Sequence, residues 1–96
     1  KLLLDIALFL NERPNLTKIE IQGHTDQRGR RSYNINLSEK RAAAVKRFLV
    51  KEGSVDPSRL SSKGYGPDQP LVDGDTRAAR AKNRRVELVV TGRIDE

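Results

Sequence analysis

The chain has 96 residues, of which 35% are hydrophobic and 33% charged, a balance typical of a water-soluble folded protein. No apolar run is long enough to cross a bilayer, and the absence of cysteine excludes disulfides and thiolate chemistry. Nineteen Lys and Arg against thirteen Asp and Glu give a net charge of +6, which favours anionic partners such as nucleic acid, lipid head groups or an acidic polymer. The length predicts one domain over residues 1–96.

The first part of the chain predicts a helix followed by a strand. Apolar residues recur at helical spacing before Pro14, which ends the helix. Residues 17–23 then alternate apolar and polar side chains, as in a half-buried strand, and residues 24–32 form a polar loop. The apolar face of the first helix consists of Leu2, Leu3, Ile6 and Leu10.

A long central helix is predicted over residues 31–52, with Gly53 following its end. Arg41 lies four residues after Leu37 and four before Val45, so we expect it on the buried face. That face is predicted to contain Tyr33, Leu37, Ala44, Val45, Phe48 and Leu49. A second, polar stripe is formed by Asn34, Ser38 and Arg41.

Asp26 and Arg41 place opposite charges on two different elements, one after a strand and one inside a helix. A charge that faces inward is costly unless it is paired or meets a charged ligand. One interpretation is a cleft that receives a ligand carrying both charges. The other is an internal ion pair between the two side chains that stabilises the fold, and the residues alone favour neither.

The second part of the chain predicts a short strand over residues 59–65 and a loop rich in Pro, Gly and Asp over residues 66–75. Thr76 can cap a short basic helix that continues to residue 82. Residues 85–91 form the clearest strand, because Val86, Leu88 and Val90 alternate onto one face.

Catalysis and metal binding find little support in the sequence. His24 lies two residues before Asp26, where it could ligate a metal or form half of a catalytic dyad. However, the chain has no second His and no Cys for a zinc site, and no G-x-S-x-G motif for a nucleophile. We therefore expect no enzyme, no metal and no cofactor, and interpret His24 as a loop residue that fixes the turn.

Nucleic-acid binding is the main alternative function. The segment from Lys63 to Gly66 is similar to the start of an RNA-recognition strand, but Pro67 and Asp68 follow where aromatic residues should continue it. Two Tyr and two Phe also offer few surfaces for base stacking. Basic residues gather at Arg77, Arg80, Lys82, Arg84 and Arg85 and along the central helix at Lys40, Lys46, Arg47 and Lys51. A basic RNA- or DNA-binding module thus remains the alternative.

Several motifs, in order along the whole chain, resemble the OmpA-like peptidoglycan-binding domain of bacterial envelope proteins, a family that includes Pal-type lipoproteins and MotB-type stator proteins. They are Ile19-Glu20-Ile21-Gln22-Gly23-His24-Thr25-Asp26, Tyr33-Asn34, Leu37-Ser38, Arg41-Ala42, Arg59-Leu60, Gly64-Tyr65-Gly66 with Pro70, and Asn83-Arg84-Arg85-Val86-Glu87. The resemblance implies an α+β fold of the β/α/β/α/β type, a mixed sheet with helices packed on one face. The family's usual first strand precedes the first helix and is missing here, so we expect an N-terminally truncated fragment. Arg30 and Arg31 depart from the family pattern of small or acidic residues.

The resemblance also implies a ligand, the diaminopimelate of the peptidoglycan stem peptide. The family's aspartate and arginine match Asp26 and Arg41, which would bind the ammonium and the carboxylate of the diaminopimelate side chain. Asn34 and Thr25 match neighbouring positions, and backbone amides of residues 25–29 would complete the cradle. Because neighbouring strand residues point to opposite sides, we expect Arg84 rather than Arg85 to line the pocket.

These implications together predict a non-catalytic protein that holds an envelope protein to the cell wall without a covalent bond. Its partner would be the peptidoglycan stem peptide and its location the periplasm, in association with the outer membrane. No nucleic acid is expected to bind.

Overall fold

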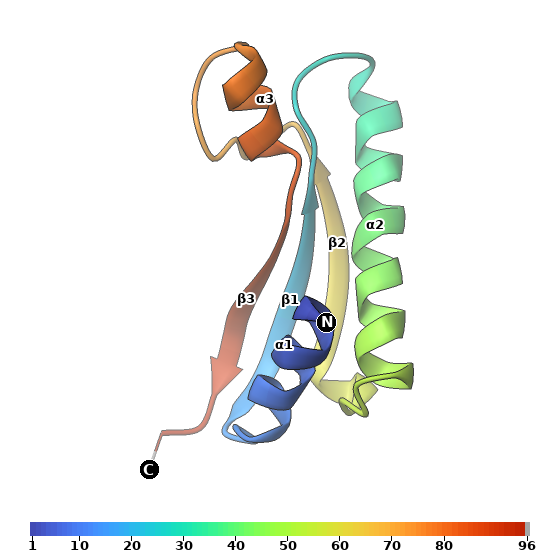
Figure 1. Cartoon of the computed structure of the whole chain (residues 1–96), viewed down its shortest axis with the longest axis vertical. Helices are drawn as coiled ribbons and strands as arrows, with labels where there is room; N and C mark the ends of the chain where they lie inside the picture. The colour runs from blue at the N-terminus through green and yellow to red at the C-terminus, as the bar shows by residue number, and fades with distance from the viewer. Residues whose placement is uncertain (96) are drawn as a thin grey trace.

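The computed structural model describes residues 1–95, which form helices around a small sheet (Figure 1). In chain order the elements are α1 (Leu2–Asn11), β1 (Leu16–His24), α2 (Arg31–Lys51), the short 3-10 helix η1 (Pro57–Arg59), β2 (Leu60–Gly66), α3 (Arg77–Asn83) and β3 (Val86–Arg93). Every element expected from the sequence is present, within about two residues at most ends. None of the helices in residues 1–95 is both long and apolar enough to span a membrane.

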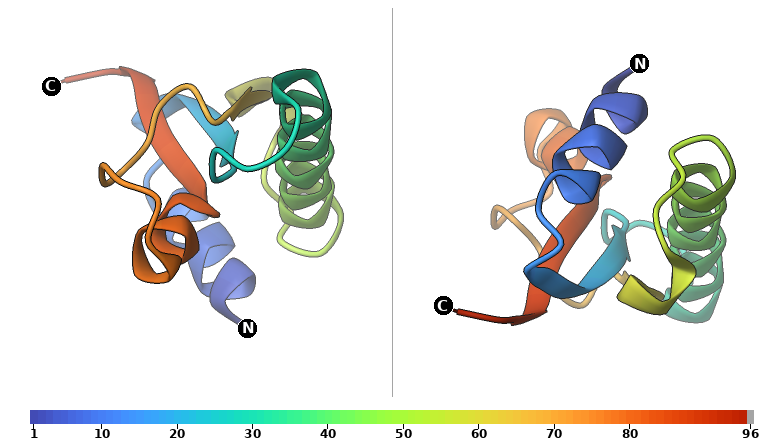
Figure 2. Two further views of the ribbon diagram at one scale, coloured as in Figure 1. Left: turned by 90° about the horizontal axis from the view of Figure 1, so that it is seen from above. Right: turned by 90° about the horizontal axis from the view of Figure 1, so that it is seen from below.

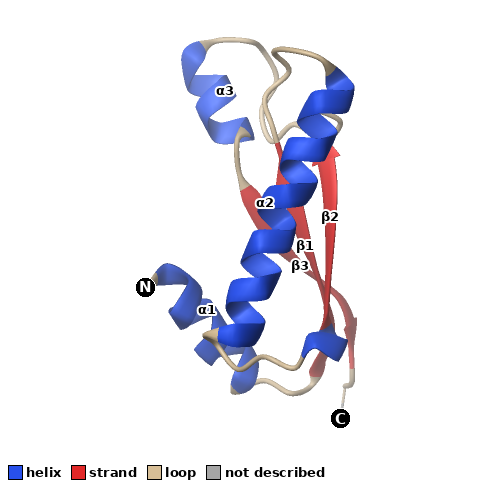
Figure 3. Ribbon diagram, turned by 90° about the vertical axis from the view of Figure 1, so that its right-hand side faces the viewer, coloured by secondary structure: helices blue, strands red, loops and turns tan. Residues whose placement is uncertain are grey.

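The sheet is mixed, with strand order β2-β1-β3. The central strand β1 pairs with β2 in parallel and with β3 in antiparallel orientation. Seen from above and below, the helices lie on one side of this sheet (Figure 2), and α2 runs along most of its length (Figure 3). The α+β class and the mixed sheet with helices on one face are therefore confirmed.

The core lies between the sheet and the two longer helices. Alternation along β1 directs Ile19 and Ile21 toward the helices, where both are almost fully buried. They pack with Ala42 and Leu49 of α2 in one apolar cluster. The remaining buried members of the cluster are Ala7, Leu10, Leu16, Val55 and Leu60.

The predicted buried face of α2 is partly wrong, and Arg41 does not face inward. The buried stripe of α2 consists of Asn34, Ser38, Ala42 and Leu49, whereas Tyr33 is 63% exposed and Ala44 and Arg41 are also exposed. Each helical residue turns the chain by about 100°, so Arg41 lies roughly 60° around the helix from Ser38, at the edge of the buried stripe. A long cationic side chain at such an edge extends into water.

Other sequence expectations are also corrected by burial. In α1 the buried side chains are Ala7 and Leu10, while Leu2 is 72% exposed. On β3, Val90 is 45% exposed, although Val86 and Leu88 do pack against the core as expected. After α2 the residue in the left-handed conformation is Ser54, with φ of 57°, and not Gly53.

Glycines let α2 approach the two parallel strands closely near the end that carries Asp26. A Cβ on Gly23 would lie 2.1 Å from the carbonyl oxygen of Ser38, and a Cβ on Gly64 would lie 2.6 Å from Ser38 Oγ. The hydroxyl of Ser38 donates to the carbonyl of Ile35 at 2.9 Å and accepts the N–H of Gly66 at 3.0 Å. This contact joins α2 to the end of β2.

Candidate functional site

The candidate site is built on the loop between β1 and α2, at the end of the molecule where α3 also lies (Figures 1 and 3). The loop is held by hydrogen bonds to β2 and to α2. The N–H of Thr25 donates to the carbonyl of Gly66 at 2.9 Å, and the amide of Asn34 donates to the carbonyl of Arg28 at 2.8 Å. Gly29 has φ of 88°, a conformation that favours glycine. The loop is therefore pre-formed around Asp26.

Asp26 carries the buried charge of this site. Its Oδ1 accepts the backbone N–H of Arg28 at 3.0 Å, and its Oδ2 lies 2.9 Å from Nη1 of Arg84. The residue is only 8% exposed. The hydrogen bond from Arg28 N–H, together with Arg84, lowers the pKa of Asp26 below its ordinary value and outweighs the opposing effect of burial. Asp26 is consequently a carboxylate anion at neutral pH.

Arg84 reaches Asp26 from the junction between α3 and β3. Thr76 caps α3 as predicted, since its side chain accepts the N–H of Ala79 at 3.1 Å. At the other end, the side chain of Asn83 binds the N–H groups of Leu71 and Val72 at 2.8 and 3.1 Å and the carbonyl of Val72 at 3.1 Å. These bonds hold the backbone next to Arg84 in place.

Arg84 and Arg85 have different partners, although β3 begins only at Val86 and strand alternation therefore does not apply to them. Arg85 pairs with Glu87, which follows it by two residues, and donates to the carbonyl of Gln69 at 3.1 Å. Arg84 contacts Asp26 instead. Of the two arginines, Arg84 is the one that the structure brings to Asp26; its role in lining a ligand pocket stays a prediction.

Arg41 is not joined to Asp26. Within residues 1–95 no ion pair or hydrogen bond of the Arg41 side chain is found, so the internal Asp26–Arg41 bridge considered above does not form. Two residues on one flank of α2, Ile35 and Glu39, approach Gly66 and Gly64 of β2. Arg41 lies on the opposite flank, away from β2, about 10 Å along the helix axis from Asn34.

Thr25 and Asn34, the other predicted residues, do lie beside Asp26, but both are buried and bonded within the loop. The Thr25 hydroxyl donates to the carbonyl of Asp26 at 2.9 Å. Two of the backbone amides expected to cradle a ligand, those of Thr25 and Arg28, are already used by Gly66 and Asp26. These groups therefore hold the loop in its conformation, and their hydrogen bonds are made within the protein.

Two features of the site escaped the sequence reasoning. Asp26 forms an Asx-turn, in which its side chain accepts the backbone N–H of Arg28. Asp commonly forms such turns in loops, so the sequence did contain a signal for this one. The ion pair between Arg31 and Asp68, with Nε to Oδ1 at 2.9 Å, joins α2 to a loop 37 residues away and left no local signal. It also gives Arg31, a departure from the family pattern, a defined partner.

His24 is not a loop residue, because it is the buried last residue of β1. Its ring stacks on Tyr65 with centroids 5.5 Å apart, and its Nε2 lies 3.2 Å from Oε1 of Gln22. The Tyr65 hydroxyl donates to Glu20 at 2.8 Å. The one aromatic ring of the RNA-like segment is therefore already engaged by neighbours on the open face of the sheet.

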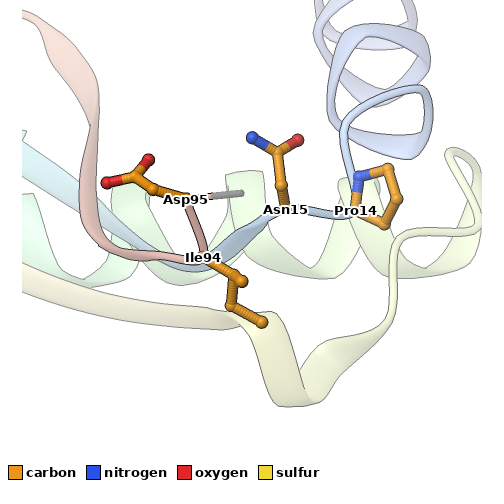
Figure 4. Close-up of a pocket in the computed structure, with 4 residues that line it drawn as sticks. All are labelled: Pro14, Asn15, Ile94 and Asp95. Atoms are coloured by element: carbon orange, nitrogen blue, oxygen red, sulfur yellow. The ribbon is translucent and has the colours of Figure 1, made fainter.

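A hollow of about 520 Å³ lies far from Asp26, near the start of β1. It is lined by Pro14, Asn15, Ile94 and Asp95, which Figure 4 shows as sticks. It offers one carboxylate and no cation, so it cannot hold both charged groups of a zwitterionic ligand. The charged groups that meet at Asp26 make the loop end the better candidate.

The sequence is similar to those of known proteins. The chain is 49% identical over 87 residues to outer membrane protein Omp38 of Acinetobacter baumannii, covering 91% of this chain but 24% of that protein. It is 46% identical over 71 residues to the peptidoglycan-associated lipoprotein of Pseudomonas aeruginosa, covering 74% of this chain and 42% of the relative.

Solved structures show the same fold. The peptidoglycan-associated lipoprotein of Burkholderia pseudomallei superposes with a TM-score of 0.83 at 39% identity, covering 92% of this chain and 73% of that one. The cell wall anchor of the type VI secretion system of Pseudomonas aeruginosa superposes with a TM-score of 0.80 at 32% identity, covering 95% and 64%. The model of the OmpA family matches residues 1–84. The chain belongs to the OmpA family.

Proposed function

We propose that this chain binds peptidoglycan without a covalent bond and so anchors an envelope protein to the cell wall. The relatives named above are an outer membrane protein, peptidoglycan-associated lipoproteins and a cell wall anchor, which supports this role and a location in the bacterial envelope. The chain spans about a quarter of the length of Omp38. We further propose that it works on the periplasmic side of the outer membrane.

The ligand that we propose is the diaminopimelate of the stem peptide. Its side chain ends in an ammonium and a carboxylate, so it needs a fixed anion and a cation within a few ångströms of each other. The observation that carries this proposal is Asp26, a buried carboxylate held in its charged form at the rim of a pre-formed loop. Asp26 accepts the ammonium, because a buried carboxylate with lowered pKa offers a charge-assisted hydrogen bond.

Two arginines are proposed to supply the cation, Arg84 beside Asp26 and Arg41 farther along α2. Arg41 extends from the flank of α2 that faces away from β2, with its guanidinium free to grip the carboxylate in a planar, bidentate manner. Arg84 adds a second guanidinium directly beside Asp26. Thr25 and Asn34 hold the loop that carries Asp26 in place. The mode of action is binding alone, with no chemical step.

Co-sedimentation with purified insoluble peptidoglycan tests this function. The wild-type chain should sediment with the wall, and Asp26→Asn should stay in solution. Asp68→Asn is the matched control, because it removes another carboxylate that pairs with an arginine at the same end of the molecule. Gel shifts with RNA and DNA run in parallel. A shift together with no sedimentation would instead support the nucleic-acid module.

A further inference from the structure

Asp26 and Arg84 hold each other in the absence of ligand. Both oxygens of Asp26 are in use, one by the N–H of Arg28 and one by Arg84, and the side chain of Asp26 is 10% exposed. A ligand ammonium therefore meets a carboxylate that is already neutralised. Each carboxylate oxygen can accept two hydrogen bonds, but only 10% of this side chain is exposed, so an ammonium that approaches Oδ2 competes with Arg84 for it.

The two partners of Asp26 differ in how easily they can leave. The N–H of Arg28 is part of the loop backbone, which Asn34 and Gly66 fix through hydrogen bonds. The Arg84 side chain is 43% exposed, and its described bonding is the single contact of Nη1 with Asp26. Because Asn83 and Arg85 hold the backbone on either side, the side chain of Arg84 can turn away without moving the strand.

We propose that the Asp26–Arg84 ion pair is a latch that makes the site selective for a ligand carrying both an ammonium and a carboxylate. This inference rests on the function proposed above. A ligand with both charges gives Asp26 an ammonium and gives the released Arg84 a carboxylate, so one internal pair is exchanged for two new ones. A ligand with an ammonium alone breaks the pair and leaves Arg84 without a partner. Arg84 thus adds to the selectivity that Arg41 provides, because it competes with the ligand for Asp26 until the ligand offers a carboxylate in exchange.

A lysine-type stem peptide has the ammonium but lacks the carboxylate. Removal of Arg84 should affect its binding differently depending on whether Arg84 acts as a latch or only binds the ligand's carboxylate. If Arg84 only grips the carboxylate, its removal leaves the affinity for the lysine-type peptide unchanged. If Arg84 blocks Asp26, its removal frees the carboxylate, and that affinity should rise by about three- to tenfold. Affinity for the diaminopimelate-type peptide should not rise by the same factor, because a carboxylate contact is lost.

Calorimetric titration of soluble stem peptides of both types into wild type, Arg84→Ala and Arg84→Gln tests the latch. Arg30→Ala is the matched control, since it removes one exposed positive charge from the same loop end without breaking an ion pair within residues 1–95. Arg41→Ala is a second control, expected to weaken only the diaminopimelate-type peptide. The expected signature is a gain for the lysine-type peptide in both Arg84 variants and in neither control.

The outcomes separate the two proposals. If the wild type binds the diaminopimelate-type peptide but the Arg84 variants show no gain for the lysine-type peptide, the latch is wrong and the proposed function stands. A gain of equal size in Arg30→Ala would also overturn the latch, because it would reflect general charge repulsion. If the wild type binds neither peptide, both proposals fail. Circular dichroism and unfolding in urea establish that each variant is folded before it is titrated.

Discussion

Gly23 of β1 and Gly64 of β2 are partners in the parallel register, and both lie against the turn of α2 that carries Ser38. A side chain at either position would collide with backbone atoms. A Cβ on Gly23 would lie 2.1 Å from the carbonyl oxygen of Ser38, and a Cβ on Gly64 would lie 2.4 Å from the backbone nitrogen of Glu39. This pair of glycines sets the distance between α2 and the sheet. It thereby places the start of α2, with Asn34, against the loop that carries Asp26.

Replacing Gly23 with Ala should destabilise the protein, because the new Cβ overlaps the backbone of α2 and the helix must move. Overpacking of this kind costs about 1–3 kcal/mol in the free energy of unfolding, and contact with backbone favours the upper end. Urea unfolding measures the loss. Gly92→Ala is the milder control, since the three atoms nearest its Cβ are side-chain atoms of Lys18 and Thr17 at 3.0–3.2 Å rather than backbone at 2.1 Å. Equal losses in both variants would contradict this close approach of helix and sheet.

The sequence alone predicts those parts of the molecule that have local signals. Thr76, Pro14 and the alternation through Ile19 and Ile21 each mark an element boundary or a buried face, and the structure follows them. The inward direction of Arg41 was wrong because periodicity counts apolar residues, whereas the buried stripe of α2 is built from Asn34, Ser38 and Ala42 as well as Leu49. Small and polar residues lie in this stripe because α2 packs closely against the glycines of the two strands, Gly23 and Gly64.

The site itself was predicted only in part. The place of Asp26, directly after a strand, could be read from the motif. Its actual partner, Arg84, is 58 residues away and is brought close by the order β2-β1-β3 and by the position of α3. Strand alternation predicted that Arg84 and Arg85 point to opposite sides, but β3 begins at Val86, and only the tertiary structure shows which of them contacts Asp26.

His24 should make the protein less stable in weak acid. Burial, with the nearby Arg85, lowers the pKa of His24 below the ordinary value of 6.5, and this outweighs the opposite effect of Glu87. The unfolded chain therefore takes up a proton at higher pH than the folded one, and protonation favours unfolding. The free energy of unfolding should fall as the pH drops below about 6.5 toward the lower pKa of the folded state.

A series of urea unfolding curves from about pH 8 to about pH 5 measures this effect. His24→Phe keeps an aromatic ring against Tyr65 and removes the Nδ1 atom, which has no hydrogen-bond partner within residues 1–95. The variant should lose most of the pH dependence in this range. An unchanged pH dependence in His24→Phe would assign the effect to other groups.

Arg41 should contribute to affinity through the ligand's carboxylate. Amidating the terminal carboxylate of diaminopimelate removes its charge and one acceptor oxygen, and a charged hydrogen bond is worth about 1.5–3 kcal/mol, so affinity should fall about ten- to a hundredfold. In Arg41→Ala the difference between the free and the amidated peptide should shrink. Calorimetry at two salt concentrations separates this from general attraction to a +6 chain, which salt would abolish. If Arg41→Ala distinguishes the two peptides as well as wild type does, Arg41 has no role at the carboxylate.

Prolonged incubation with peptidoglycan should release no soluble fragments. Asp26 is held as an anion with a lowered pKa, whereas a general acid or base that works near neutral pH needs a raised one. Mass spectrometry of the supernatant is the measurement. Muropeptides that appear with wild type and are absent with Asp26→Asn would contradict the anchor function and indicate an enzyme.

The central claim is that the buried carboxylate of Asp26 binds the ammonium of diaminopimelate. Calorimetric titration of a soluble diaminopimelate stem peptide into wild type, Asp26→Asn and Asp68→Asn tests it most directly. The exchange of Asp for Asn keeps the shape and removes the charge, so affinity should fall about tenfold or more in Asp26→Asn. Asp68→Asn should bind as wild type does. Wild-type affinity in a folded Asp26→Asn variant would contradict the account.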